Sequence, residues 1–366
     1  MKLQKNKRKK IWIAVLSVII VTTLGFAGYM AYGSYKLEQL SKMSSDEMIA
    51  YTTKDVEDAV ITVGIIQNGS MSYTVYGKSG MVLEPKEYTY EIGSITKTFT
   101  TALLCKAIRE DKIRLDDSIS KYLDLPNKEY YPTIKSLVTH TSGYRKYYFE
   151  RPMISNFLNG RNDYFGITED MLVSRIGKID LEEKDYKFTY SNFGISVVGA
   201  VLEKVYGEDY ASLMNTYIKN DLGLANTKIS RGKGDFANYW EWSESDAYLP
   251  AGALLSNVSD MLSYAQMQLQ ENPAYLSLAH QSLTEIHATS QVNRKMGINL
   301  DEMGVGWVID QENDIIWHNG ATGDFNSYLG FDKEKQIAVV VLSNLPPKHR
   351  IPATVIGIEI LTTLQN

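Results

Sequence analysis

The sequence contains a single cysteine, Cys105, among 366 residues. A lone cysteine excludes an internal disulfide and any site that needs a cysteine pair, such as a Cys-x-x-Cys metal or redox motif. Cys105 lies in an apolar stretch with a helical pattern, so we interpret it as a small buried core residue. A chain of this length can form a core large enough to be stable outside the cell without disulfide bonds.

Histidine and clustered positive charge are also scarce. Of the five histidines, His280, His287 and His349 have no potential metal ligands at useful spacing, so we expect no metal and no other cofactor. The formal net charge is -5, and the only dense basic run lies at the extreme N-terminus. Because nucleic-acid binding requires a basic surface, we expect no nucleic-acid partner. Hydrophobic residues make up 44% and charged residues 22%, which is ordinary for a globular protein.

The N-terminal region contains the longest apolar segment. Six basic residues precede it: Lys2, Lys5, Lys7, Arg8, Lys9 and Lys10. The uncharged stretch over residues 11–35 is long enough for a transmembrane helix, which needs about 20 residues. The basic flank should stay in the cytoplasm, which places the rest of the chain outside the cell. A cleavable signal peptide would have a shorter apolar region and a small-x-small cleavage site, which residues 27–31 match poorly.

These features predict a single-pass membrane protein with an extracellular domain. A cytoplasmic basic segment would cover residues 1–10, a transmembrane anchor residues 11–35, and a linker residues 36–55. The folded domain would then extend over residues 56–366.

Strand patterns occur at both ends of the expected domain. Residues 60–66 and 71–76 flank an Asn-Gly turn and predict a β-hairpin. Four more strands are predicted near the C-terminus, at residues 306–309, 315–318, 327–331 and 337–342. Residues 116–290 favour helices and loops, and residues 351–364 a final helix. We therefore expect an α/β fold of the α+β kind, in which N- and C-terminal strands form one antiparallel sheet flanked by helices, with a mostly helical inserted region.

The pattern Ser-x-x-Lys occurs three times, beginning at Ser94, Ser118 and Ser230. At a helix start, a lysine three residues after a serine shares its face and can accept the hydroxyl proton. Ser118 follows a charged stretch and Ser230 precedes a Gly-Lys-Gly loop, so both are expected at the surface. Only Ser94, with Lys97, follows an apolar lead-in and precedes a long amphipathic helix. Spacing alone leaves open whether Ser94 is a nucleophile or a helix cap.

Two further segments carry polar residues that suit a hydrolytic site. Tyr190 and Asn192 lie two residues apart; a tyrosine of lowered pKa can act as a base, and an asparagine amide can hold a substrate carbonyl. Residues 317–321 end a predicted apolar strand, where Gly320 would let a substrate backbone approach. The amide of Ala321 could then donate to an oxyanion. Each signal is weak by itself.

Taken together, six ordered segments resemble the serine β-lactamase and penicillin-binding-protein family, of the class C β-lactamase, D,D-carboxypeptidase and related esterase type. The segments are residues 92–100, 115–123, 137–144, 190–192, 250–256 and 318–320. The first contains the nucleophile motif with Ser94 and Lys97, and the third matches the family in its Thr-His-Thr-Ser-Gly run. Tyr-Ser-Asn is similar to the family's Tyr-x-Asn motif, and His-Asn-Gly to the His-x-Gly form of its last motif. The resemblance covers about residues 55–345 and implies a β-lactamase/transpeptidase-like fold.

The resemblance also implies a mechanism. Ser94 would attack a carbonyl and form an acyl-enzyme that water then hydrolyses, with Lys97 and Tyr190 sharing the work of the base. The residues expected to bind the substrate are Asn192, His318, Asn319, Gly320 and Ala321. The amides of Ser94 and Ala321 would form the oxyanion hole, and no separate deacylating glutamate is implied.

His318 is a departure from the β-lactamases, which usually carry Lys-Thr-Gly at this place. A lysine there helps to hold a substrate carboxylate, whereas a histidine is mostly neutral at pH 7. The His-x-Gly form occurs in some D,D-carboxypeptidases, D-aminopeptidases and esterases. This departure therefore favours a peptidase or esterase activity over efficient β-lactam hydrolysis.

Three hypotheses follow for the function. The first is a cell-wall hydrolase at the cell membrane, acting on peptidoglycan peptides or on D-alanyl esters of teichoic acid. The second is a β-lactamase or a general carboxylesterase. The third is a binding or sensor protein that keeps the fold without catalysis, although all the motif residues are present.

Overall fold

The computed structural model describes residues 38–366. The predicted transmembrane anchor, residues 11–35, lies outside the described part of the chain. Between residues 38 and 366, no helix combines the length and apolar character that crossing a membrane requires.

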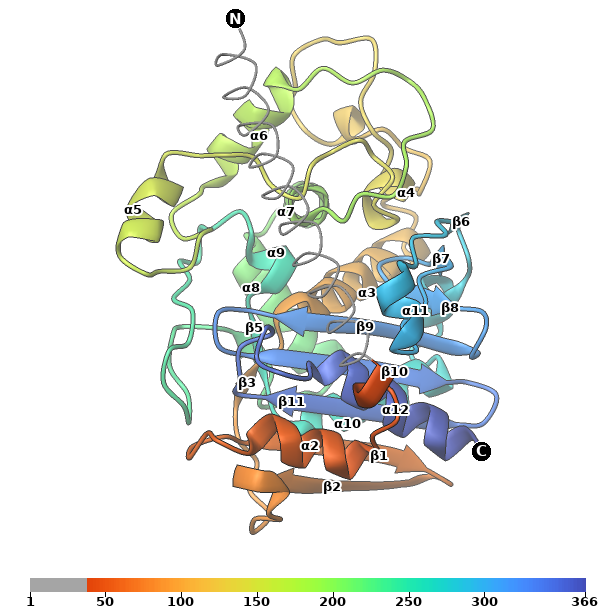
Figure 1. Ribbon diagram of the computed structural model, residues 1–366. Helices are drawn as coiled ribbons and strands as arrows, with labels where there is room; N and C mark the ends of the chain where they lie inside the picture. The colour runs from red at the N-terminus through yellow and green to blue at the C-terminus, as the bar shows by residue number, and fades with distance from the viewer. Residues whose placement is uncertain (1–37) are drawn as a thin grey trace, which may run out of the picture.

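An eight-stranded antiparallel sheet forms the centre of the molecule (Figure 1). Its strands, in spatial order, are β2 (Ser70–Tyr76), β1 (Ile61–Gln67), β11 (Ile337–Ser343), β10 (Asn326–Asp332), β9 (Ile315–Ala321), β8 (Val308–Asp310), β7 (Glu302–Met303) and β6 (Thr284–Glu285). Strand β1 pairs with β2 on one side and with β11 on the other. The predicted joining of N- and C-terminal strands in one sheet is therefore confirmed.

The hairpin between β1 and β2 forms where the sequence predicts it. Asn68 and Gly69 have φ values of 53° and 75°, so both turn residues lie in the left-handed region that a tight two-residue hairpin requires. The turn fixes the register, in which Gln67 faces Ser70. All inward and outward side chains of β1 follow from that register, because a slip of one residue would exchange the two faces.

Helices cover both faces of the sheet (Figure 1). Helices α2 (Ser45–Thr53) and α12 (Ala353–Gln365) pack on one face, and α10 (Val258–Gln270) and α3 (Thr96–Arg109) lie on the other. Every residue of β11 is buried, and its side chains alternate between the two layers. Val339 and Val341 contact the α12 side, whereas Val340 and Leu342 belong to the core on the α3 side. This double burial explains the uninterrupted apolar run of β11.

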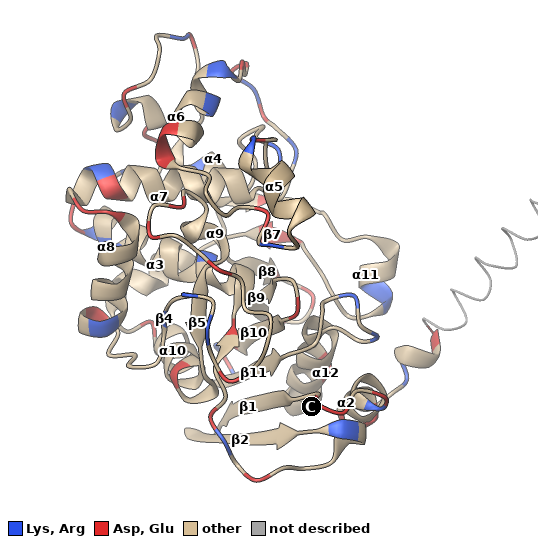
Figure 2. Ribbon diagram, turned by 90° about the vertical axis from the view of Figure 1, so that its left-hand side faces the viewer, with Lys and Arg blue, Asp and Glu red and all other residues tan. Residues whose placement is uncertain are grey.

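The remaining helices lie mainly between α3 and α10 in sequence. They are α4 (Ile134–Val138), α5 (Pro152–Leu158), α6 (Glu169–Lys178), α7 (Asn192–Tyr206), α8 (Tyr210–Thr216) and α9 (Leu249–Gly252), with α11 (Gln291–Lys295) following later. Most charged residues of the protein lie on helices and loops outside the central strands (Figure 2). Strands β9, β10 and β11 together contain one charged residue, Asp332.

A second, three-stranded sheet was not predicted. It consists of β3 (Tyr90–Glu91), β5 (Leu254–Ser256) and β4 (Lys228–Ile229), in that spatial order. Strands of two or three residues are too short to show an alternating pattern, and the β3–β5 pairing joins segments more than 150 residues apart. Helix α10, which lies within the predicted helical region, packs directly on the main sheet.

The α12–sheet contact leads to a stability prediction at Gly357. A Cβ atom at this position would lie 2.0 Å from Cδ1 of the buried Tyr328 ring on β10. We expect Gly357→Ala to lower the free energy of unfolding by about 1–3 kcal/mol, because overpacking exceeds the gain of about 1 kcal/mol in helix propensity. Urea unfolding followed by circular dichroism measures this change. The control is Thr363→Ala at an exposed site of the same helix, which we expect to be neutral or slightly stabilising. Equal effects of the two substitutions would contradict the prediction.

Candidate active site

Ser94 lies in a short 3₁₀ turn, Gly93–Ile95, between β3 and the first residue of α3. Gly93 has a φ of 49°, and a Cβ there would lie 2.5 Å from the backbone nitrogen of Ala321. Glycine is therefore required both by the backbone conformation and by the approach of β9. This arrangement holds the Ser94 backbone next to Ala321, as expected for two amides that form one oxyanion hole.

Lys97 is completely buried, with an exposed fraction of 0%. Its Nζ lies 2.8 Å from Ser94 Oγ and 2.6 Å from the carbonyl oxygen of Ala251, which follows directly on the chain from Pro250. Burial, with a smaller contribution from the charge of Lys146, holds the pKa of Lys97 well below its usual range. A neutral amine can accept a hydroxyl proton, and the structure brings the two predicted side chains within the distance that such a transfer requires.

Tyr190 lies two residues before the first residue of α7, and Ser191 between them caps that helix by accepting a hydrogen bond from the Gly194 amide at 2.8 Å. The Tyr190 ring centroid lies 5.0 Å from Lys97 Nζ. Burial raises the pKa of Tyr190, although the Ser94 side chain acts in the opposite direction. Tyr190 is therefore protonated at neutral pH, which makes Lys97 the better first acceptor of the Ser94 proton.

Strand β9 carries the other predicted substrate-binding residues. Burial and the Lys97 charge lower the pKa of His318 to about 3, so this imidazole is neutral at physiological pH. His318 is 2% exposed and is not among the side chains that line the cavity at Ser94, whereas Asn319, Gly320 and Ala321 do line it. The Asn319 amide already donates a hydrogen bond to Thr354 Oγ1 on α12, at 2.8 Å.

Gly320 has a role that the sequence analysis did not anticipate. A Cβ at this position would lie 1.9 Å from the carbonyl oxygen of Ile92 and 2.4 Å from Ser327 Oγ. Ser327 itself donates a hydrogen bond to that same carbonyl, at 2.9 Å. The absence of a side chain at Gly320 therefore lets the backbone just before Ser94 lie directly against β9. This role is separate from the predicted one, which is to leave space for a substrate.

The other two Ser-x-x-Lys patterns have no such arrangement. Ser118 caps a short 3₁₀ turn, and the lysine of its motif, Lys121, is exposed and pairs with Asp117 at 2.8 Å. The expectation that Ser230 lies at the surface is wrong, because this residue is 1% exposed and its hydroxyl donates to the Trp240 carbonyl at 3.1 Å. Ser230 directly follows β4 of the small sheet, and its amide donates a hydrogen bond to the Ala253 carbonyl at 2.7 Å.

Ser94 opens into a cavity of about 680 Å³ with an aromatic wall that sequence reasoning missed. The wall consists of Tyr147, Tyr164, Trp240, Trp242 and Tyr248. Lys146, Lys348 and Asp163 are the charged residues that line the same cavity. The abundance of tyrosine in the sequence gave no signal, because a tyrosine at a core edge has the same local pattern as one in a cleft.

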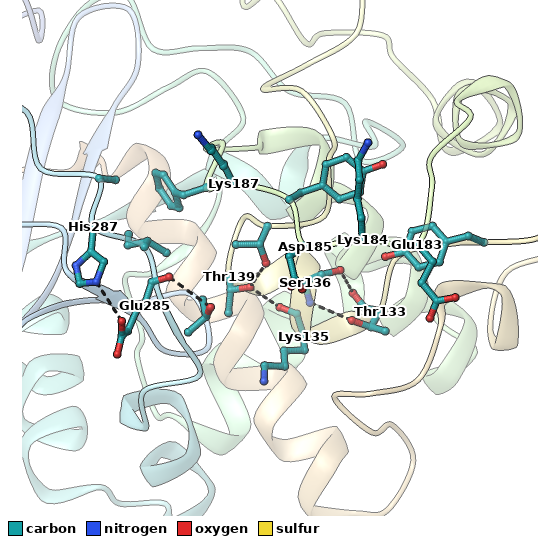
Figure 3. Close-up of a pocket in the computed structure, with 17 residues that line it drawn as sticks. Thr133, Lys135, Ser136, Thr139, Glu183, Lys184, Asp185, Lys187, Glu285 and His287 are labelled. Carbon is teal, nitrogen blue, oxygen red and sulfur yellow. Dashed lines mark hydrogen bonds and ion pairs between the residues drawn. The ribbon is translucent and has the colours of Figure 1, made fainter.

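Figure 3 shows a larger cavity, of about 940 Å³. Phe188 lines both this cavity and the one at Ser94. Threonines and charged side chains of both signs surround the larger cavity, including Lys135, Glu183 and Asp185. His287 contacts Glu285 at 3.1 Å there, and both side chains are exposed. Ser94 does not line this cavity, and no group of three His, Cys, Asp or Glu side chains within residues 38–366 is arranged to hold a metal ion.

Glu91, three residues before Ser94, is a second residue that the sequence analysis missed. Its side chain is 2% exposed and accepts hydrogen bonds from Thr322 Oγ1 and from the Trp240 amide, both at 2.5 Å. Glu91 therefore links the backbone before Ser94 to Thr322, which follows Ala321, and to Trp240 of the aromatic wall. Burial raises the pKa of Glu91 to about 7, with the two hydrogen bonds acting in the opposite direction.

The raised pKa of Glu91 predicts a pH-dependent stability. The carboxyl group has a pKa of about 7 when folded and about 4.5 when unfolded, so its contribution is complete below pH 4.5 and is lost as the pH rises through 7. We expect the free energy of unfolding of the wild type to fall by roughly 2–3 kcal/mol between pH 5 and pH 8 relative to Glu91→Gln, which cannot ionise. Denaturant unfolding at several pH values measures the difference. Parallel curves for the two proteins would contradict the prediction, and the exposed Glu285→Gln serves as the control.

Comparisons with known proteins identify the family and the fold. The family model described as Beta-lactamase matches residues 56–357. A β-lactamase/D-alanine carboxypeptidase from Yersinia pestis, solved with citrate, has a TM-score of 0.71 at 18% identity and covers 91% of this chain and 99% of that one. The octameric penicillin-binding protein homologue from Pyrococcus abyssi has a TM-score of 0.68 at 21% identity, covering 87% of this chain and 75% of that one. Because both sequence identities are low, 18% and 21%, the structural similarity shows a shared fold and nothing beyond it.

Two curated relatives extend the comparison. Protein flp of Staphylococcus aureus strain N315 is 23% identical over 338 residues, which are 86% of this chain and 65% of the relative. The chain thus spans somewhat less than two thirds of that relative's length. A β-lactamase from Providencia stuartii is 25% identical over 372 residues and covers 89% of this chain and 93% of the relative. The matched family model, the fold and the ordered motifs together show that the chain belongs to the β-lactamase family, with the β-lactamase/transpeptidase-like fold.

Proposed function

We propose that this protein is a serine hydrolase in which Ser94 forms an acyl-enzyme. The observation that carries the proposal is the position of Lys97, whose Nζ lies 2.8 Å from Ser94 Oγ and is excluded from solvent. A charged amine would be costly in this place, so the neutral form that can accept a proton is favoured.

The first step is the attack of Ser94 Oγ on a substrate carbonyl carbon, with its proton passing to Lys97 Nζ. The amides of Ser94 and Ala321 then donate hydrogen bonds to the oxyanion, and the start of α3 adds favourable electrostatics. Tyr190, whose ring centroid lies 5.0 Å from Lys97 Nζ, then gives its hydroxyl proton to the leaving group and takes up the proton that Lys97 accepted from Ser94, so that both side chains return to their neutral forms. Hydrolysis of the acyl-enzyme by water repeats these transfers in the reverse direction.

The substrates that we propose are D-alanyl peptides or D-alanyl esters of the cell envelope. One solved relative is a β-lactamase/D-alanine carboxypeptidase, which supports this class. The predicted anchor at residues 11–35 would hold the domain at the outer side of the cell membrane, near such substrates. The neutral His318 favours the same class, because it does not supply the positive charge that a lysine at this place provides for a β-lactam carboxylate.

The proposal is tested by turnover of D-alanyl-D-alanine peptides and D-alanyl esters by the extracellular part of the chain. We expect Ser94→Ala to lower kcat/KM by at least about 1000-fold without loss of folding, since the nucleophile is removed while the helix start is kept. Lys97→Met should give a comparable loss. Ser118→Ala is the matched control from another Ser-x-x-Lys pattern and should retain wild-type turnover. Equal activity of wild type and Ser94→Ala on every substrate would contradict the proposal.

The second candidate is a β-lactamase, and the relative from Providencia stuartii supports it. Intact mass after incubation with benzylpenicillin separates the two. We expect an adduct of the penicilloyl mass that persists for minutes and is absent in Ser94→Ala, because the family resemblance implies no deacylating glutamate and His318 stands in the place of the lysine of the third motif. Rapid nitrocefin hydrolysis without an observable adduct would instead establish the β-lactamase.

A further inference from the structure

His140 ends helix α4 in a backbone conformation that a histidine rarely adopts. Its φ is 58°, which lies in the left-handed region. The His140 amide donates a hydrogen bond to the Leu137 carbonyl at 3.2 Å. The Thr141 amide donates to the Ser136 carbonyl at 2.9 Å. These two bonds form a Schellman motif, in which the left-handed residue after the helix is usually a glycine. A histidine at this position is therefore less favourable than a glycine would be.

The His140 side chain has a second unfavourable feature. Its Nδ1 accepts a hydrogen bond from the Ser191 amide at 3.2 Å, so the ring proton lies on Nε2. Nε2 is buried and has no hydrogen-bond partner within residues 38–366. Burial, followed by the charges of Lys97 and His318, holds the pKa of His140 well below its usual range, which keeps Nδ1 free to accept. A residue that keeps two unfavourable features is a candidate for a functional role.

His140 binds the two amides on either side of Tyr190. Its carbonyl oxygen accepts a hydrogen bond from the Thr189 amide at 2.8 Å, and its Nδ1 accepts the one from Ser191. The rings of His140 and Tyr190 also pack together, with a centroid distance of 4.7 Å and an angle of 48°. Residues 181–190 form neither helix nor strand, so no regular structure fixes Tyr190 from its N-terminal side. The backbone and the side chain of one residue thus hold this segment at two points.

We propose that His140 is a positioning residue that clamps the backbone on both sides of Tyr190, and so holds the Tyr190 hydroxyl where it can protonate the leaving group. The Tyr190 ring centroid lies 5.0 Å from Lys97 Nζ, and a misplacement of about 1 Å can slow a reaction by up to about 100-fold. The role rests on the proposed acyl-enzyme at Ser94. It assigns to the end of α4 the control of one step, the departure of the leaving group.

Two substitutions separate the Nδ1 acceptor from the other properties of His140. Glycine and asparagine both tolerate the left-handed backbone, and both remove the imidazole ring. Asparagine keeps an acceptor, Oδ1, near the place of Nδ1, whereas glycine has none. His140→Asn is therefore the matched control for His140→Gly, because the main difference between the two variants is the bond to the Ser191 amide.

The 4-nitrophenyl and methyl esters of D-alanine test the role in catalysis. The 4-nitrophenolate group leaves as an anion at neutral pH, whereas methoxide requires a proton as it departs. We expect His140→Gly to lower kcat/KM at least about tenfold on the methyl ester and less than about threefold on the 4-nitrophenyl ester. His140→Asn should stay within about threefold of the wild type on both. Losses in His140→Gly that are equal on the two esters, absent on both, or matched by His140→Asn would overturn the inference while the Ser94 proposal stands.

Amide hydrogen exchange tests the clamp without turnover. The Ser191 amide is bound by the side chain of His140, whereas the Thr189 amide is bound by the backbone carbonyl, which every variant keeps. We expect the Ser191 amide of His140→Gly to exchange at least about tenfold faster than in the wild type or in His140→Asn, and the Thr189 amide to change less.

This exchange decides the inference if the wild type turns over only one of the esters or neither. If neither ester shows turnover that depends on Ser94, the proposed function fails, and faster Ser191 exchange in His140→Gly alone would still support the clamp. Unchanged Ser191 exchange in His140→Gly would overturn the inference in every case.

Discussion

The burial of one lysine amine, that of Lys97, is the constraint on which the site depends. This amine lies in the interior with the Ser94 hydroxyl and the Ala251 carbonyl as its hydrogen-bond partners, and no carboxylate pairs with it among the described residues. Removing a charged amine from water without a counterion is unfavourable, so the folded protein favours the neutral amine. The fold supplies the free energy for this through the packing of α3 against α7, α9 and α10.

The second requirement of the site is that the backbone around Ser94 and the backbone of β9 lie in direct contact. Gly93 and Gly320 let the nucleophile segment and β9 touch where any side chain would collide. Ser327 ties the same two segments through the Ile92 carbonyl, and Glu91 ties them through Thr322. The two amides that we propose as oxyanion donors, those of Ser94 and Ala321, are therefore placed by backbone contacts between the small sheet and β9, which fix their positions before any substrate binds.

The sequence predicted those parts of the molecule that depend on local patterns. The β1–β2 hairpin, the central strands β9 to β11 and the helix after Ser94 have periodicity and turn residues that identify them without tertiary information. Ser94 was distinguishable from Ser118 because an apolar lead-in and a long helix surround it. Tyr164 and Glu91 were not predictable, since their partners lie 28 and up to 231 residues away and no local pattern marks a tyrosine or glutamate for such a contact. The burial of Ser230 was missed for the same reason, because it depends on a sheet of very short strands.

The protonation state of Lys97 is the most direct test of this account. Lysine labelled with ¹³C at the ε-carbon reports the state of each amine by NMR, and the resonance absent from Lys97→Met identifies this one. The account predicts an amine that is neutral at pH 7 and titrates well below the ordinary lysine value of about 10.4. A resonance that is charged at pH 7 and titrates near the ordinary value would contradict it, because a charged Lys97 could not take the Ser94 proton.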